Sequence, residues 1–217
     1  MINEKYKQMI YAKSVIRELS EYATARGEEI GYENVFDYSL GNPSVPVADD
    51  YTRAIIELHE ESDPISLHGY SPSLGNTEVR GIVADSLKRR FGLPYETRHI
   101  FMTSGAAGAI AHALRAVTKP GDTVLGFAPY FPEYMPYVND TGAVLKLVPA
   151  DTVHFQINME ELEKMFDEDV AAVLINSPNN PSGAVYTDDT LQRLTDFMRA
   201  KQEEYGHDIF LISDEPY

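Results

Sequence analysis

Short apolar runs recur through the second half of the chain and predict the strands of a sheet. Each run is rich in Val, Ile, Leu and Phe, and most do not alternate with polar residues. The runs are His99–Thr103, Thr123–Ala128, Ala143–Val148, Ala171–Asn176 and Asp208–Ser213. Runs of this kind are typical of strands that are covered on both faces, as in a parallel sheet.

Segments with helical spacing of apolar residues lie between these runs. Helices are predicted over Ala106–Val117, Met159–Phe166 and Asp188–Tyr205. Because strands and helices alternate, the fold class that we predict is α/β, a doubly wound and mostly parallel sheet.

The first half of the chain predicts three further helices. Glu4–Arg26 forms an amphipathic pattern that ends at Gly27, and its apolar positions are Val15, Ile16, Leu19 and Tyr22. The segment VFDYSLGNPSVP then predicts a short extended piece followed by a loop. The second helix is Asp49–Ser62, closed by Pro64.

A third helix in this half carries signals at both of its ends. Asn76 can cap its first turn, which contains Glu78, and Gly92 follows its last turn. Its inward-facing residues are expected to be Val79, Ile82, Val83 and Leu87.

Composition and charge restrict the possible partners. The chain has 217 residues, of which 43% are apolar and 24% charged, and its formal net charge is −16. Phosphate backbones and anionic membranes are repelled by such a charge, so neither nucleic acid nor a membrane is an expected partner. There is no cysteine. The opening MINEKYKQMIYAK lacks the apolar core of a signal peptide, so a soluble, cytoplasmic protein is expected.

The residues that follow each strand carry the candidate chemistry, because ligands bind beyond the carboxyl ends of parallel strands. Ser104–Gly108 consists of small residues that open a helix, so its backbone N–H groups can approach an anion closely. The same residues also suit a tight strand-to-helix turn. Tyr130 and Phe131 can stack on a flat ligand or simply pack in the core.

Two polar segments complete this edge of the predicted sheet. Ser177–Gly183 is a rigid turn that can aim amide side chains at the sheet's end, although such turns also form for local reasons. Asp214 ends an apolar strand, where a carboxylate needs a cation or several donors. Together the segments describe a ligand with an anionic tail, a flat ring, a polar substituent and a protonated ring nitrogen. Pyridoxal 5′-phosphate has all of these features.

The order of these segments resembles that of the fold-type I pyridoxal-phosphate aminotransferases, the class I/II, aspartate aminotransferase-like group. The matching blocks are LGNPS at 40–44, GYSPSLGNTEVR at 69–80, MTSGAAGA, APYFPEY, NSPNNPSGAVY at 176–186, and SDEPY at the end. The resemblance covers the whole chain. It implies transfer of an amino group from an amino acid to a 2-oxo acid.

The resemblance also implies roles for single residues. Asp214 would bind the pyridine nitrogen, Asn180 and Tyr217 the phenolic oxygen, and Phe131 would stack on the ring. The phosphate would lie at Gly105, Ala106 and Ala107. Gly41, together with Asn180, would contact the substrate. Tyr70 would reach the phosphate of a partner subunit, so a homodimer is expected. The alternative is that Tyr70 is an aromatic residue of a loop without this role.

The chain departs from the family at the lysine that holds the cofactor as a Schiff base, because no matching lysine is found. None of the eight lysines lies in the family's Ser/Lys-containing loop, so no catalytic residue is assigned, and no metal site is expected. We expect residues 1–45 to belong to or pack on the small domain, and 46–217 to form the N-terminal part of the large domain. The rest is expected to be missing, with the lysine encoded a few tens of residues beyond Tyr217.

This interpretation has three consequences, and three other interpretations compete with it. The 217-residue chain alone is expected to be inactive, to bind the cofactor weakly at best, and to leave Asp214 facing water. A lyase or synthase on the same scaffold, a non-catalytic binding or sensor module, and a plain nucleotide-binding sheet are the alternatives. The charge argues against a DNA-binding regulator, and a nucleotide site does not explain Asn180 together with Asp214.

Overall fold

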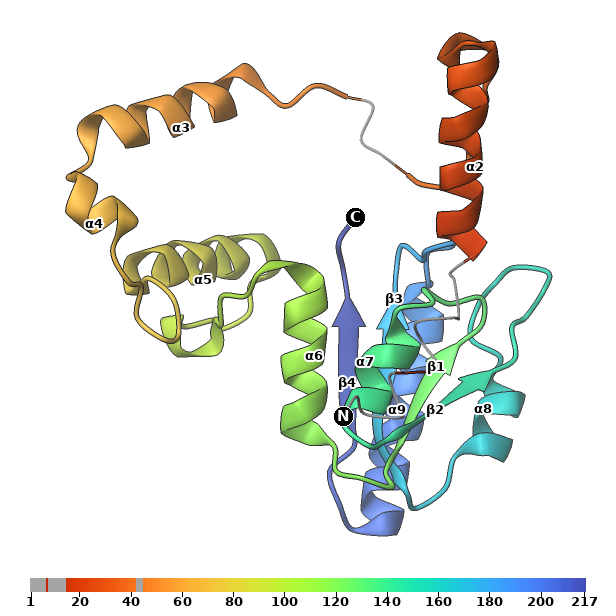
Figure 1. Cartoon of the computed structure of the whole chain (residues 1–217). Helices are drawn as coiled ribbons and strands as arrows, with labels where there is room; N and C mark the ends of the chain where they lie inside the picture. The colour runs from red at the N-terminus through yellow and green to blue at the C-terminus, as the bar shows by residue number, and fades with distance from the viewer. Residues whose placement is uncertain (1–6, 8–14, 42–44) are drawn as a thin grey trace. The chain divides into compact units, whose positions relative to one another are not determined.

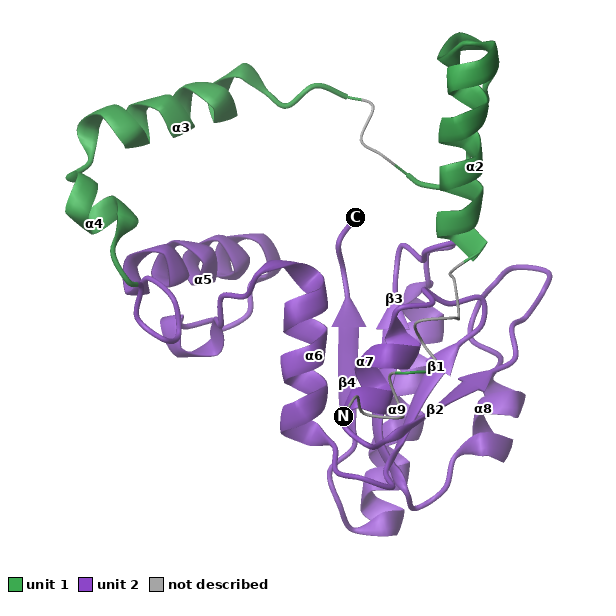
Figure 2. Ribbon diagram, in the orientation of Figure 1, with its two compact units in different colours: residues 1–70 green, residues 71–217 purple. Residues whose placement is uncertain are grey.

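The computed structural model describes residue 7 and residues 15–41 and 45–217, drawn in colour in Figure 1. The chain divides into two compact units, residues 1–70 and 71–217 (Figure 2). That residues 1–45 belong to or pack on a small domain, and that 46–217 form part of the large domain, stay predictions.

The first unit consists of helices and connecting segments. Its elements are α2 (Val15–Ile30), the 3₁₀-helix η2 (Tyr32–Asn34), α3 (Asp49–Glu61) and α4 (Pro64–His68). No strand occurs among the residues described in this unit. Of the predicted first helix, the part before Val15 lies outside the described residues apart from Lys7, as do positions 42–44 of the LGNPS block.

The predicted end of the first helix is wrong. α2 continues through Gly27 to Ile30, and Gly31, with a φ of 88°, follows its last residue. Gly27 is buried against Tyr32, whose ring occupies the place that a Cβ on Gly27 would take. It therefore permits close packing rather than ending the helix. The second predicted helix, Asp49–Ser62, is confirmed within one residue, since α3 ends at Glu61 with Ser62 as its C-cap. Pro64 begins α4, where a missing N–H costs nothing.

The second unit is built on a parallel four-stranded sheet with the order β2-β1-β3-β4. Its strands are β1 (Thr123–Phe127), β2 (Val144–Val148), β3 (Val170–Asn176) and β4 (Phe210–Asp214). The register pairs Phe127 with Val148 and Asn176 with Asp214. Four of the predicted strands and the doubly wound α/β fold class are thus confirmed.

Helices cover both faces of the sheet (Figure 1). They are α6 (Gly105–Val117), α7 (Tyr134–Asp140), α8 (Met159–Met165) and α9 (Asp188–Tyr205). Leu114 of α6 and Val138 of α7 pack with Leu174 on one face. On the other face Leu162 of α8 and Leu194 of α9 pack with the opposite side of the strands. The sequence missed α7, whose segment contains Pro132 and Pro136.

The predicted strand His99–Thr103 is wrong. The chain forms a short 3₁₀-helix, η3 (Thr97–His99), and then an extended segment without a strand partner in the described part. The buried guanidinium of Arg80 donates to the backbone oxygens of Thr97 and Ile100, at 2.8 Å each. These bonds hold the segment against its neighbouring helix, so part of its backbone is satisfied without a sheet.

That helix, α5 (Thr77–Phe91), has the predicted ends and part of the predicted inward face, since Val83 and Leu87 are half-buried. The Asn76 side chain accepts from the N–H groups of Glu78 and Val79, and Gly92 adopts the left-handed conformation. Arg80 and Ala84 are its buried residues, whereas Val79 and Ile82 are exposed. The inward orientation predicted for Val79 and Ile82 is therefore wrong.

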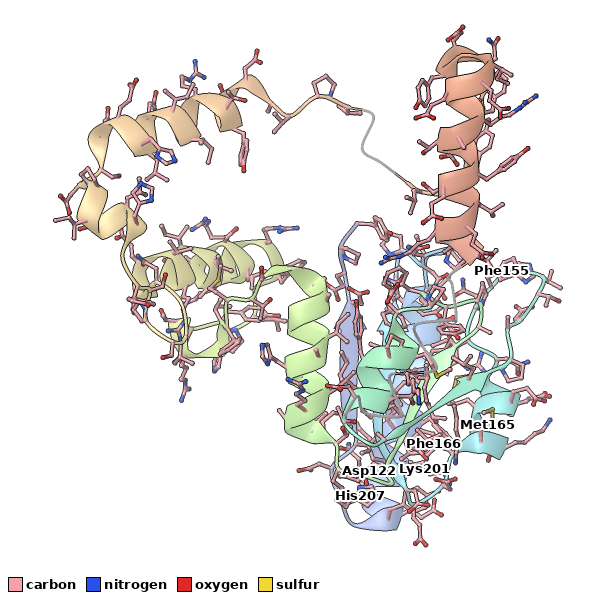
Figure 3. All side chains as sticks on the ribbon, in the orientation of Figure 1. Asp122, Phe155, Met165, Phe166, Lys201 and His207 are labelled. Atoms are coloured by element: carbon pink, nitrogen blue, oxygen red, sulfur yellow. The ribbon has the colours of Figure 1, made fainter. Side chains whose placement is uncertain are left out.

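Aromatic packing joins the ends of α8 and α9. Phe166, labelled with Met165 and Lys201 in Figure 3, meets Phe197 edge-to-face at a centroid distance of 5.1 Å. The ammonium of Lys201 lies 5.3 Å from the centre of the Tyr205 ring.

No described helix is long and apolar enough to cross a membrane, and no metal-binding cluster of His, Cys, Asp or Glu occurs in the described ranges.

Candidate functional site

A cavity of about 280 Å³ lies at the carboxyl ends of the strands in the second unit. Asn176 and Asp214, the last residues of β3 and β4, line it from the sheet. The other lining residues come from α6, from α7 and from the loops that follow β1, β3 and β4. They are Ala106, Ala107, Ile110, Phe131, Tyr137, Asn180, Pro216 and Tyr217.

Most of the sequence-predicted site residues meet in this cavity. Those that line it are Ala106, Ala107, Phe131, Asn180, Asp214 and Tyr217. Gly105 is the first residue of α6, directly before Ala106. Gly41 and Tyr70 belong to the first unit, so their predicted contacts with this site stay predictions.

The N-terminus of α6 is open to a ligand. Ser104 makes no capping hydrogen bond with its side chain, whereas Asn158 and Thr187 cap α8 and α9. Gly105 has a φ of 81°, and apart from its chain neighbours and the backbone of its own helix, no atom lies within 4 Å of the position that a Cβ would occupy. The first N–H groups of a helix have no partner within the helix and carry a partial positive charge. An anionic group fits at this place.

Asp214 is held at the floor of the cavity by a tyrosine from α7. Its side chain is buried, with the residue 9% exposed, and its Oδ2 accepts a hydrogen bond of 2.5 Å from the hydroxyl of Tyr134. Its Oδ1 accepts none from the described part of the chain. The expectation that Asp214 faces water is therefore wrong, because α7, which the sequence did not predict, covers it.

The environment of Tyr134 keeps its hydroxyl in the donating form. Burial raises the pKa of Tyr134 well above its ordinary value, and the hydrogen bond to Asp214 and the charge of that carboxylate raise it further. Burial also raises the pKa of Tyr137, with smaller effects from Glu133 and Asp214. Both phenols are therefore neutral near pH 7, and Tyr134 remains a donor to Asp214.

Asn176 connects the loop after β3 with the end of β4. Its Nδ2 donates to the backbone oxygen of Asp214 at 2.9 Å, and its Oδ1 accepts from the backbone N–H of Asn180 at 2.6 Å. The side-chain amide of Asn180 makes no hydrogen bond with the described residues. It therefore has donors and an acceptor available to a ligand in the cavity.

Aromatic rings form part of the wall. Phe131 packs edge-to-face on Tyr134, with centroids 5.6 Å apart and ring planes at 79°. Tyr217 also lines the cavity and is 71% exposed. A flat ligand can contact these rings on one side while its edge meets the polar residues of the strand ends.

Sequence reasoning missed several residues of this site. Tyr134 and Tyr137 lie on α7, three residues apart and therefore on one face, a spacing visible in the sequence. Asn176 is the polar residue that ends an apolar run, which was the available signal for it. No lysine occurs among the residues that line the cavity in the described structure.

The family model for aminotransferases of class I and II matches residues 33–217. The chain belongs to this family. The resemblance stated from the sequence motifs is therefore confirmed, and the α/β sheet with its strand-end cavity is the fold expected for an aminotransferase.

Individual relatives support the same assignment. The chain is 32% identical to an aspartate aminotransferase of Pyrococcus abyssi over 206 residues, which are 94% of this chain and 49% of that protein. It is also 32% identical over 189 residues to aromatic-amino-acid aminotransferase 2 of Thermococcus litoralis, covering 86% of this chain and 46% of that protein.

Among solved structures, an aminotransferase from Eubacterium rectale matches with a TM-score of 0.96 and 43% identity. The match covers 100% of this chain and 55% of that one. The chain spans about half the length of the curated aminotransferases that it matches.

Proposed function

We propose that this chain supplies the cofactor pocket of a pyridoxal-phosphate-dependent aminotransferase that moves an amino group from an amino acid to a 2-oxo acid. One observation carries the proposal: a buried carboxylate, Asp214, and the uncapped start of α6, at Ala106 and Ala107, line the same cavity. A cation-binding group and an anion-binding group in one small cavity suit a ligand that has a protonated ring nitrogen and a phosphate.

The phosphate would be held by the backbone of α6. The N–H groups of Ala106 and Ala107 follow the open position at Gly105, where no side chain blocks an approaching oxygen atom. Asp214 would accept a hydrogen bond from the ring nitrogen through Oδ1, since Tyr134 occupies Oδ2. The negative charge of Asp214 would keep that nitrogen protonated.

The remaining residues would orient the ring. Asn180 and Tyr217 would hydrogen-bond the phenolic oxygen, and Phe131 would pack on the ring face. Pyridoxal phosphate supplies, when bound, an electron-accepting ring that stabilises negative charge at the α-carbon of an amino acid. The chain's own contribution is therefore binding, orientation and a fixed charge at the ring nitrogen. Gly41 would contact the substrate carboxylate.

We also propose a homodimer in the cytoplasm. Tyr70 is fully exposed at the end of the first unit, and α3 presents exposed apolar residues, namely Tyr51, Ile55, Ile56 and Leu58. A second subunit would cover such a surface and receive Tyr70. Light scattering on the full polypeptide that the native gene encodes is expected to give a dimer at micromolar concentration. A fully active monomer would contradict this proposal.

A half-reaction tests the proposed function. The full polypeptide, loaded with pyridoxal phosphate, is mixed with single amino acids in the absence of a 2-oxo acid, and the cofactor is then extracted and separated by chromatography. An aminotransferase is expected to yield one pyridoxamine phosphate per site with at least one amino acid. A lyase would release product without accumulating pyridoxamine phosphate, and a binding module would change neither amino acid nor cofactor.

The 217-residue chain by itself is expected to show no transaminase activity. The lining of its cavity, as far as it is described, offers no lysine to hold the cofactor covalently or to move the α-proton. Borohydride reduction in the presence of pyridoxal phosphate, followed by mass spectrometry, is expected to show no stoichiometric adduct at one lysine. A single such adduct together with amino acid turnover would overturn this prediction.

A further inference from the structure

The strand ladder between β3 and β4 stops at the rung where the cavity begins. Asn176 and Asp214 are the last paired residues. Two residues after each of these strand ends there is a proline, Pro178 after β3 and Pro216 after β4, and neither has an N–H to donate. Beyond this rung the two loops that carry the predicted ligand contacts are therefore not held together by the regular ladder.

The side chain of Asn176 bridges this gap. Asn176 is only 3% exposed, and its single amide donates to the backbone oxygen of Asp214 and accepts from the backbone N–H of Asn180. Both groups of the amide are thus used, and each fixes the backbone of a different predicted cofactor contact. Buried hydrogen bonds that share one planar group constrain the positions of both partners relative to each other.

We propose that Asn176 is a positioning residue that sets the spacing between Asp214 and Asn180, and so couples recognition of the ring nitrogen to recognition of the phenolic oxygen. This inference rests on the proposed function, since both contacts are contacts to pyridoxal phosphate. Asn176 itself acts through its two neighbours.

Tyr134 gives Asp214 a second, independent support. Its hydroxyl orients the carboxylate through Oδ2, but it has no hydrogen bond to the loop that carries Asn180. Loss of Tyr134 is therefore expected to disturb nitrogen recognition alone. Of these two residues, Asn176 alone is hydrogen-bonded to both Asp214 and Asn180, so substitutions at Asn176 and at Tyr134 are expected to have different effects on ligand binding.

Ligand analogues that lack either the ring nitrogen or the phenolic oxygen distinguish the effect of Asn176 from that of Tyr134. Calorimetry on the cofactor-free full polypeptide would measure dissociation constants for pyridoxamine 5′-phosphate, for its 1-deaza analogue without the ring nitrogen, and for its 3-deoxy analogue without the phenolic oxygen. The wild type is expected to prefer the parent compound by about tenfold or more over each analogue, a factor that corresponds to about 1.4 kcal/mol.

Variants then assign the two preferences. The nitrogen preference is the ratio of the affinity for the parent compound to that for the 1-deaza analogue, and the oxygen preference is the same ratio for the 3-deoxy analogue. Asn176→Ser is expected to reduce both by about threefold or more, because Asp214 and Asn180 both lose their fixed position. Asp214→Asn and Tyr134→Phe are expected to reduce the nitrogen preference only, and Asn180→Ala the oxygen preference only. If Asn176→Ser does not fold, Asn176→Asp provides the test. It keeps an acceptor for Asn180 and loses the donor to Asp214, so the oxygen preference is expected to survive.

Asn158→Ala serves as the matched control. Asn158 also uses its side-chain oxygen as an acceptor, here for the backbone N–H of Glu161 at the start of α8, and it does not line the cavity. Its replacement is expected to lower stability and leave both preferences unchanged. If Asn176→Ser lowered the affinity for all three ligands equally, or not at all, both preferences would be intact and the role of Asn176 would be overturned. A wild type that does not bind pyridoxamine phosphate would instead overturn the proposed function.

Discussion

Replacing Asp214 with asparagine is expected to weaken binding of pyridoxamine 5′-phosphate by about 10- to 100-fold. The substitution keeps the shape of the side chain and its bond to Tyr134, but removes the negative charge of Asp214 from the lining of the cavity. A hydrogen bond to a charged group contributes about 1.5–3 kcal/mol, and each 1.4 kcal/mol is about tenfold in affinity. Calorimetric titration of the full polypeptide measures the loss directly.

The matched control for this prediction is Asp208→Asn. Asp208 is exposed and lies just before β4, so the change in charge and composition is the same but the cavity is untouched. The affinity of this variant is expected to stay within about twofold of the wild type. An Asp214→Asn variant that binds as tightly as Asp208→Asn would contradict the assignment of Asp214 to the ring nitrogen.

Truncating Leu125 to alanine is expected to lower the free energy of unfolding by about 3–4 kcal/mol. Leu125 is completely buried in β1, with Lys146 of β2 and Val173 of β3 as its neighbours in the sheet. The close packing of the strands restricts collapse around the missing atoms, so both the lost burial and the remaining cavity are destabilising. Urea-induced unfolding followed by circular dichroism measures the change.

An exposed leucine provides the comparison. Leu93 is 53% exposed, and Leu93→Ala removes the same atoms from a site that water already reaches. Its effect on the unfolding free energy is expected to stay within about 0.5 kcal/mol. Equal losses in the two variants would show that β1 is not the centre of the core.

The sequence predicted the strands of the sheet where apolar character continues through a whole run. Ala171–Asn176 matches β3 because a strand covered on both faces needs apolar residues at every position. The same pattern misled at His99–Thr103. Whether an apolar run becomes a strand depends on a neighbour to pair with, and Arg80 binds this segment's backbone instead.

The sequence predicted some of the residues that line the cavity, but not the contacts that hold them in place. Motifs that follow the apolar runs identified Ala106, Asn180 and Asp214, which the structure brings to one cavity, although the run before Ala106 is not a strand. The burial of Asp214 was not predictable, because its cause is Tyr134, 80 residues away in the sequence and on an unpredicted helix. The bridge made by Asn176 likewise depends on which strands are neighbours.

A crystal structure of the full polypeptide with pyridoxamine 5′-phosphate tests the central claim most directly. We expect the phosphate at the backbone N–H groups of Ala106 and Ala107, and the ring nitrogen within hydrogen-bond distance, about 2.7–3.2 Å, of Oδ1 of Asp214. An ordered cofactor outside this cavity, or one whose ring nitrogen points away from Asp214, would contradict it.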